Sequence, residues 1–205
     1  MLAAHHALRR DLVSLARAAQ FAGLPDPARR RSVAAGWGTF KRQLHAHHKA
    51  EDELIWPLLR QRLTHSENGL SVLGEMEAEH ALVDPLLDAV DAAFSEKSPS
   101  GGPGPGRGRG DAVDALTVAL TSHLTHEERD ALPLIGVTLT AREWRGAGLR
   151  IARRNGLSGT AEMFPWMVEG APQEEVRATL GQLPPPARMI YRRVWKPRYK
   201  RTSRW

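Results

Sequence analysis

The sequence contains no cysteine among its 205 residues. This absence excludes disulfide bonds, thiolate zinc sites, iron–sulfur clusters and cysteine nucleophiles, and it leaves only nitrogen and oxygen ligands for any metal. No apolar run approaches the ~18–20 residues that a membrane-spanning helix needs. The first residues also lack the basic and then apolar segments of a secretory signal, so we expect a cytoplasmic protein.

The formal net charge of +6 is unevenly distributed along the chain. Residues 1–139 contain 15 Lys/Arg and 18 Asp/Glu, a balance of −3, whereas residues 140–205 contain 14 and 5, a balance of +9. The basic character therefore belongs to the last third of the chain, and the first part is neutral to acidic.

Apolar residues recur at helical spacing in four long segments, residues 3–22, 29–63, 70–95 and 111–137. No segment alternates apolar and polar residues as a half-buried strand does, so the pattern predicts an all-α protein. Gly23 and Pro25 should end the first helix, and Pro57 should kink or end the second one locally.

The segments between and after these helices divide the chain. Residues 98–110 consist only of Gly, Pro, Ser and Arg, a composition that predicts a flexible linker. Thr140 and Glu143 have the spacing of a capping box and should begin a fifth helix that ends near Gly156. We therefore predict a four-helix bundle over residues 1–138, followed by a basic, helical, Pro-interrupted extension over residues 139–205 that packs on the bundle.

Two segments of the chain repeat one arrangement of histidine, glutamate and proline. Each copy reads His-x-x-x-Glu-x5-Pro, and each has a further histidine one helix upstream. The repeat predicts two helical hairpins of one design. Its two sets of residues are His5, His47, Glu51 and Pro57, and His80, His123, Glu127 and Pro133.

The spacing suits a metal site. Residues four apart project from one face of a helix, and a bundle brings four inner faces together. Imidazole nitrogens combined with carboxylates, which can span two ions, favour iron or manganese over calcium or magnesium, while copper and zinc remain compatible with the ligand types. The predicted metal ligands are His5, His47, Glu51, His80, His123 and Glu127.

Other polar residues lie near these positions in the sequence. His6 is an alternative to His5 as the ligand from the first helix. His48, Asp52 and His126 are interpreted either as partners that orient the ligands or as polar surface.

This order of residues, His, then His-x-x-x-Glu, then His, then His-x-x-x-Glu, resembles the hemerythrin-like family with the HHE cation-binding domain over about residues 1–138. The apolar stretch 164–171 is similar to an extension of actinobacterial members. The resemblance implies an up-down-up-down four-helix bundle that holds two non-haem iron ions with an oxo or hydroxo bridge, and the two glutamates bridging. Oxygen binding, peroxide chemistry, nitric oxide binding and iron or redox sensing all occur in this family.

The sequence also departs from the oxygen-carrying hemerythrins. Met76 stands where those proteins have a second histidine on the third helix, and the chain has His-x3-Glu where they end with His-x4-Asp. Six candidate ligands in place of seven leave more positions for water or substrate, which favours redox chemistry or sensing over simple oxygen carriage.

Three hypotheses follow for the function. The first is a di-iron protein that binds or reacts with dioxygen, hydrogen peroxide or nitric oxide, with catalase-like consumption of peroxide as one activity. The second is an iron or redox sensor whose basic tail contacts another macromolecule. The third is a metal-free structural bundle. Residues 195–205 interleave five basic residues with three aromatic ones, a mixture that binds nucleic acid or an anionic membrane, or else packs within the protein.

Overall fold

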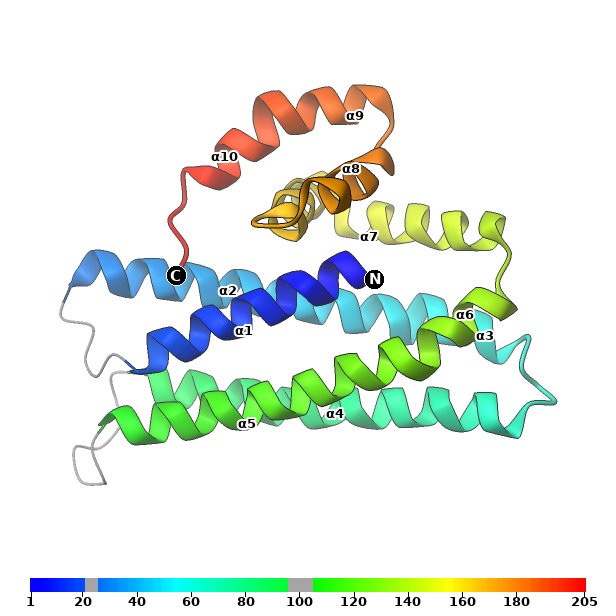
Figure 1. The fold of residues 1–205 in the computed structure, drawn as a ribbon, viewed down its shortest axis with the longest axis horizontal. Helices are drawn as coiled ribbons and strands as arrows, with labels where there is room; N and C mark the ends of the chain where they lie inside the picture. Colours follow the sequence, from blue (N-terminus) through cyan, green and yellow to red (C-terminus); the bar gives the residue numbers. More distant parts are fainter. Residues whose placement is uncertain (21–25, 96–104) are drawn as a thin grey trace.

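The computed structural model describes residues 1–20, 26–95 and 105–205, and within these ranges it contains helices and no strand (Figure 1). The all-α prediction is therefore confirmed. Among the described helices, none combines the length and the apolar character that crossing a bilayer requires. In chain order the elements are α1 (Leu2–Gln20), α2 (Pro27–Ala50), the π-helical turn η1 (Glu51–Ile55), α3 (Trp56–Arg60), α4 (Glu67–Phe94), α5 (Pro105–His126), η2 (Glu127–Ala131), α6 (Leu132–Thr138), α7 (Ala141–Val168), α8 (Gln173–Gly181), α9 (Pro185–Ile190), η3 (Tyr191–Trp195) and α10 (Lys196–Lys200).

The helices α1, α2, α4 and α5 lie along one another, and α5 packs against both α1 and α4 (Figure 1). Buried apolar side chains recur every three or four residues along the helices, and they form two separate clusters. The larger cluster includes Leu8, Leu12, Phe40, Leu44, Leu87, Leu116 and Leu120. The smaller cluster lies toward α3 and α6 and includes Ile55, Trp56, Leu59, Leu73, Met76 and Ile135.

The second and fourth long helices continue through their prolines by way of a wider turn. Proline has no N–H to donate, and its ring collides with the carbonyl four residues earlier in a regular α-helix. Before Pro57 the N–H of Trp56 donates to the carbonyl of Glu51, five residues back, and the same pattern precedes Pro133. The predicted disturbance at Pro57 is thus a π turn, and each repeated glutamate begins one of these turns.

The beginning of α5 differs from the sequence prediction. Residues 105–110, expected to belong to the flexible linker, form the first turns of this helix. Arg109 explains part of the difference, because its Nε donates to the carbonyl of Ala93 at 3.0 Å and its guanidinium lies over the Phe94 ring at 5.5 Å. Residues 98–104 of the predicted linker, and Gly23 and Pro25, lie outside the described residues.

The helix α7 begins as predicted. The Thr140 side chain accepts from the N–H of Glu143, whose carboxylate accepts from the N–H of Thr140, so the capping box is confirmed. Gly156, with φ 64° and ψ −174°, breaks the helical geometry at the predicted place. After Gly156 the chain is helical again as far as Val168, a second helical part that the sequence does not predict.

Residues of the extension contact α1 through a buried polar group. Trp166 donates from Nε1 to Asp11 Oδ2 at 2.8 Å, and both residues are buried. Arg10 donates from Nη1 to the carbonyls of Trp166 at 2.9 Å and Glu169 at 2.6 Å. The helix that carries His5 is therefore also the helix to which α7 is attached.

The end of the chain lies on α2 (Figure 1). The backbone N–H of Trp205 donates to the carbonyl of Ser32 at 3.2 Å, and Arg29 donates to the carbonyl of Trp205 at 2.6 Å. A Cβ added to Gly36 would lie 2.5 Å from the Trp205 ring, so the close approach of the indole requires glycine there. Two of the three aromatic residues of the tail, Tyr199 and Trp205, therefore pack against the rest of the protein.

Candidate metal centre

A layer of polar side chains separates the two apolar clusters. Along α2 and η1 it lies between Leu44 of the larger cluster and Ile55 of the smaller one, and on α4 it lies between Met76 and Val83. Its histidines and glutamates are nearly inaccessible to solvent, as His5, Glu51 and Glu127 show with relative exposures of 0%, 1% and 0%. Buried ionisable groups are normally paired or bound to a metal, so the side chains of this layer need one of these kinds of partner.

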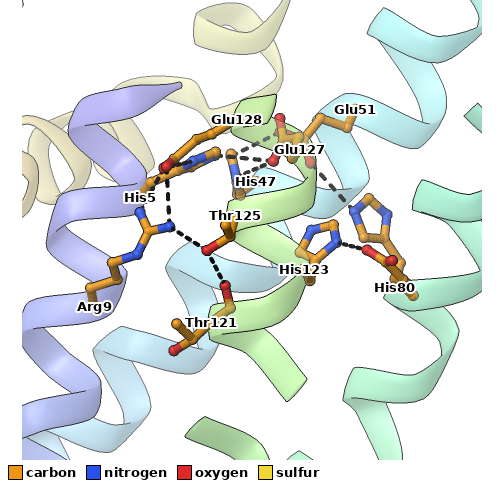
Figure 2. A network of polar contacts seen from close by, with 11 residues as sticks. His5, Arg9, His47, Glu51, His80, Thr121, His123, Thr125, Glu127 and Glu128 are labelled. Atoms are coloured by element: carbon orange, nitrogen blue, oxygen red, sulfur yellow. Dashed lines mark hydrogen bonds and ion pairs between the residues drawn. The ribbon is translucent and has the colours of Figure 1, made fainter. Parts of the chain in front are cut away.

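One group of side chains in this layer comes from α1, α2 and the two π turns. It consists of His5, His47, Glu51 and Glu127, each of which offers one potential ligand atom within 4.8 Å of the others (Figure 2). His5 Nε2 lies 3.1 Å from Glu127 Oε2, and His47 Nε2 lies 3.9 Å from the same oxygen. Separations of this size are expected between ligands of one ion whose bonds are about 2.0–2.2 Å long.

A second group contains three histidines, His48, His80 and His123, from α2, α4 and α5, with potential ligand atoms again within 4.8 Å of one another. The rings of His48 and His80 stack at a centroid distance of 3.9 Å, and the ring of His123 meets that of His80 edge-on at 4.7 Å. All three are buried.

Glu51 lies between the two groups. Its Oε1 is 3.1 Å from His47 Nδ1 in the first group, and its Oε2 is 3.6 Å from His80 Nε2 in the second. The two oxygens of one carboxylate therefore face different histidine groups, which is the arrangement that a carboxylate spanning two ions requires.

The atoms of this layer that could bind a metal have no hydrogen-bond partners among the described residues. Nine buried atoms of the layer are in this condition: Nε2 of His5, His47, His48, His80 and His123, and both carboxylate oxygens of Glu51 and Glu127. Folded proteins rarely leave buried polar atoms unpaired, since each costs about 1–3 kcal/mol. Five nitrogens and four oxygens that converge without partners fit bound metal ions, whose positive charge would satisfy all of them.

The opposite ring nitrogens of three histidines are bound by carboxylates. Nδ1 of His5 lies 2.8 Å from Glu128, Nδ1 of His80 lies 2.8 Å from Asp52, and Nδ1 of His123 lies 2.8 Å from Glu79. A carboxylate at Nδ1 holds the proton there, so that the lone pair of Nε2 points into the layer. This arrangement is typical of histidines that bind metals.

Two of these carboxylates are supported by further side chains. Arg9 donates from Nη1 and Nη2 to the two oxygens of Glu128, at 2.6 and 3.2 Å, and Nη2 also donates to Thr125 Oγ1 at 3.4 Å (Figure 2). His126 contacts the second oxygen of Glu79 at 2.7 Å. These contacts fix the carboxylates, which in turn fix the rings of His5 and His123.

Burial and neighbouring charges shift the ionisation of the layer. Burial, with smaller contributions from neighbouring histidines, lowers the pKa of His47 and of His48 well below 6.5. Burial and the adjacent Glu127 raise the pKa of Glu51 well above 4.5. For Glu79, hydrogen bonds from His126 and His123 outweigh the effect of burial and lower the pKa. The two histidines are therefore neutral and available as ligands, while the charge of Glu51 is costly without a cation nearby.

The structure brings all six predicted ligand residues into this layer and separates the alternatives. His5 points into it, whereas His6 is exposed and pairs with Glu175 of α8 at 3.0 Å. Asp52 orients His80, as one reading of the sequence suggested. His126 acts one step further out, because it contacts Glu79 and not a ligand.

His48 is the residue that sequence reasoning misplaced. We expected it to orient a ligand or to lie on the surface, but its Nε2 is one of the converging, unpartnered atoms. A signal was present, because Leu44, His47, His48 and Glu51 follow the i, i+3, i+4, i+7 spacing of a single inner face. With His48 there are seven candidate ligand residues, so the predicted shortage of ligands disappears.

Glu79 and Glu128 were not predicted at all. Each is next to a candidate ligand in the sequence, but each orients a histidine of a different helix. Only the packing of α1 and α4 against α5 brings these partners together.

The buried carboxylate leads to a prediction about the metal-free protein. Because the pKa of Glu51 is raised, the folded state holds the proton more tightly than the unfolded state does, and stability is lost as the pH rises from about 4.5 through the folded pKa. At pH 8, Glu51→Gln should therefore raise the free energy of unfolding of the metal-free protein, by an amount on the order of 1–3 kcal/mol. Urea unfolding of chelator-treated protein measures this change.

The matched control is Glu53→Gln on the same π turn, where the glutamate is exposed and pairs with Arg154 at 2.6 Å. It should change stability little, since exposed pairs contribute about 0–1 kcal/mol. In the metal-loaded protein the order should reverse, with Glu51→Gln the less stable variant. A destabilised metal-free Glu51→Gln protein would show that this carboxylate is satisfied without metal.

Comparison with known proteins agrees with this geometry. The family model of the hemerythrin HHE cation-binding domain matches residues 1–135 of the 205. Searches of the curated proteins and of the solved structures gave no match. The match covers α1 to α5, the π turns η1 and η2, and all of the residues in the polar layer. The chain belongs to the hemerythrin HHE cation-binding family.

Proposed function

We propose that this protein holds two iron ions in the polar layer and reacts there with a small oxidant, and that α1, α2, α4 and α5 form the up-down-up-down bundle of the family. The observation that carries the proposal is the set of nine converging nitrogen and oxygen atoms that have no hydrogen-bond partner among the described residues. The residues that would hold the first ion are His5, His47, Glu51 and Glu127. Those for the second ion are His48, His80 and His123, with Glu51 shared.

The chemistry of the donors supports iron. Five imidazole nitrogens and four carboxylate oxygens, without any thiolate, form a nitrogen-rich set that suits first-row transition metals better than calcium or magnesium. Pairs of iron ions in helical bundles are held by carboxylates and histidines of this kind. Manganese and zinc are the alternatives that metal analysis distinguishes.

The number of donors also supports binding of an external molecule. Even if every unpartnered atom binds, nine donors cannot fill two six-coordinate ions, and about three positions remain. Two iron ions with open positions supply electrons to, or accept them from, a small molecule such as dioxygen, hydrogen peroxide or nitric oxide. The size of the oxidant is restricted by the apolar clusters on either side of the layer.

The protein's own groups have three tasks in this proposal. Asp52, Glu79 and Glu128 keep the proton on Nδ1 of their histidines and so keep Nε2 free for the metal. Glu51 joins the two histidine groups. The surrounding leucines and Trp56 exclude bulk water, which strengthens the attraction between the carboxylates and a cation.

A sensor is the second candidate, because α1 connects the polar layer to the extension. Its His5 contacts Glu127, while Arg10 and Asp11 on the same helix bind α7. A change in the position of α1 on oxidation of the metals would therefore act on the contacts that hold the extension.

The first test is metal content. Protein purified from iron-supplemented cells should contain about two irons per chain by elemental mass spectrometry. His48→Ala should contain about one or none, because it removes a donor from the three-histidine group. His45→Ala is the matched control, since His45 is exposed on the same helix and forms an ion pair with Asp84 at 3.4 Å, away from the candidate ligands. Two irons in His48→Ala, or none in the wild type, would contradict the assignment.

The second test separates an enzyme from a sensor. Iron-loaded protein is mixed with a large excess of hydrogen peroxide, and peroxide loss is followed over time. Consumption of many equivalents per chain supports a peroxide-consuming enzyme. Oxidation that stops after a stoichiometric amount, with faster hydrogen exchange in residues 141–205, supports a sensor. The same experiment is repeated with dioxygen and with nitric oxide. If none of the three molecules reacts with the iron, both the enzyme and the sensor are refuted.

A further inference from the structure

The last helical segment of the extension, residues 185–201, is separate from the metal centre and has an unusual charge. Residues 184–205 contain eight Lys/Arg and no Asp or Glu. Elsewhere in the extension, Glu162 pairs with Arg42 of α2 at 2.8 Å and Glu175 pairs with His6 of α1 at 3.0 Å. Positive charge without any acidic residue is thus concentrated on the last segment of the extension.

This segment contacts the rest of the protein along one narrow stripe. Ala187, Tyr191, Trp195 and Tyr199, every fourth residue, are its buried or half-buried positions. In a regular α-helix, positions four apart drift by about 40° around the axis. The π turn η3 has a longer period and offsets this drift, so the stripe stays on the inner side along the whole segment.

The same register aligns a row of cations on the flank. Arg188, Arg192, Lys196 and Lys200 each follow a residue of the inner stripe by one position, and all four are exposed. Successive members of the row are about 6 Å apart along the axis. Arg193, Arg198 and Arg201 are also exposed. Within the part of the chain that the structure describes, none of these seven cations has an ion-pair or side-chain hydrogen-bond partner.

Aliphatic side chains lie among these cations. Met189, Ile190 and Val194 have relative exposures of 51%, 43% and 51%. By contrast, the aromatic residues that could stack on nucleic-acid bases are turned inward, as Tyr199 shows by its hydrogen bond to Glu169 at 3.0 Å and Trp205 by its contact with α2.

We propose that the outer face of residues 185–201, which we term the basic outer face, binds the surface of an anionic lipid bilayer. The cations would meet lipid phosphates, and Met189, Ile190 and Val194 would enter the boundary between headgroups and acyl chains. A bilayer uses both the charge and the aliphatic side chains of this face, whereas a nucleic-acid backbone uses only the charge. The proposal does not depend on the metal centre.

The test is sedimentation of the full-length, iron-loaded protein with vesicles. Vesicles of equal parts phosphatidylglycerol and phosphatidylcholine should bind the protein, and pure phosphatidylcholine vesicles should not. The triple variant Arg188→Glu, Arg192→Glu, Lys196→Glu should lower the partition coefficient by at least about tenfold, since it replaces three attractive charges near the anionic surface by three repulsive ones. Its iron content and circular dichroism show whether the fold is retained.

The matched control makes the same charge change elsewhere in the extension. Arg142→Glu, Arg145→Glu, Arg150→Glu alters three exposed arginines of α7, and should leave most of the binding intact. An equal loss in both triple variants would overturn the proposal, because net charge and not this face would then control binding.

A further variant distinguishes lipid from other polyanions. Ile190→Ser, Val194→Ser leaves the charge unchanged and should weaken vesicle binding severalfold, while binding of a duplex DNA fragment should not respond to it. If the two serines have no effect on vesicles, or if DNA binds and the anionic vesicles do not, the lipid proposal is wrong.

Discussion

Nine polar atoms between two apolar clusters have no hydrogen-bond partner among the described residues, and this deficit constrains the rest of the structure. The buried carboxylate of Glu51 and five imidazoles would be replaced by apolar groups if stability alone mattered. These polar side chains are held in fixed positions. Carboxylates orient three of the imidazole rings, and the π turns η1 and η2 set the positions of the two glutamates. Unpaired buried polar atoms lower the stability of the folded state, and bound cations among these atoms would offset that loss.

The sequence predicted the long helices and six of the seven candidate ligand residues, because helical periodicity and the His-x-x-x-Glu spacing are both local signals. It did not predict Glu79 or Glu128, since each orients a histidine from another helix and only tertiary packing reveals the pair. His48 was misplaced for a different reason. The repeated motif drew attention to His47, although the inner-face spacing from Leu44 to Glu51 included both histidines.

The extension was harder to interpret from its sequence. Composition showed that it is basic and interrupted by proline, but not that its aromatic residues face inward while its cations face outward. That division depends on the π turn η3, which keeps every fourth residue on one side. Among the residues that the structure describes, the same wide turn before a proline thus occurs three times, twice at a glutamate of the polar layer and once beneath the basic outer face.

In the proposed site, two metal ions would lie in this layer, with Glu51 between the two histidine groups. The most direct measurement is anomalous diffraction at the iron edge from crystals of the iron-loaded protein. The account predicts two peaks in each chain, one beside His48, His80 and His123 and the other beside His5 and His47, with Glu51 between them. A single peak, peaks outside the layer, or a Glu51 carboxylate bound to only one ion would contradict it.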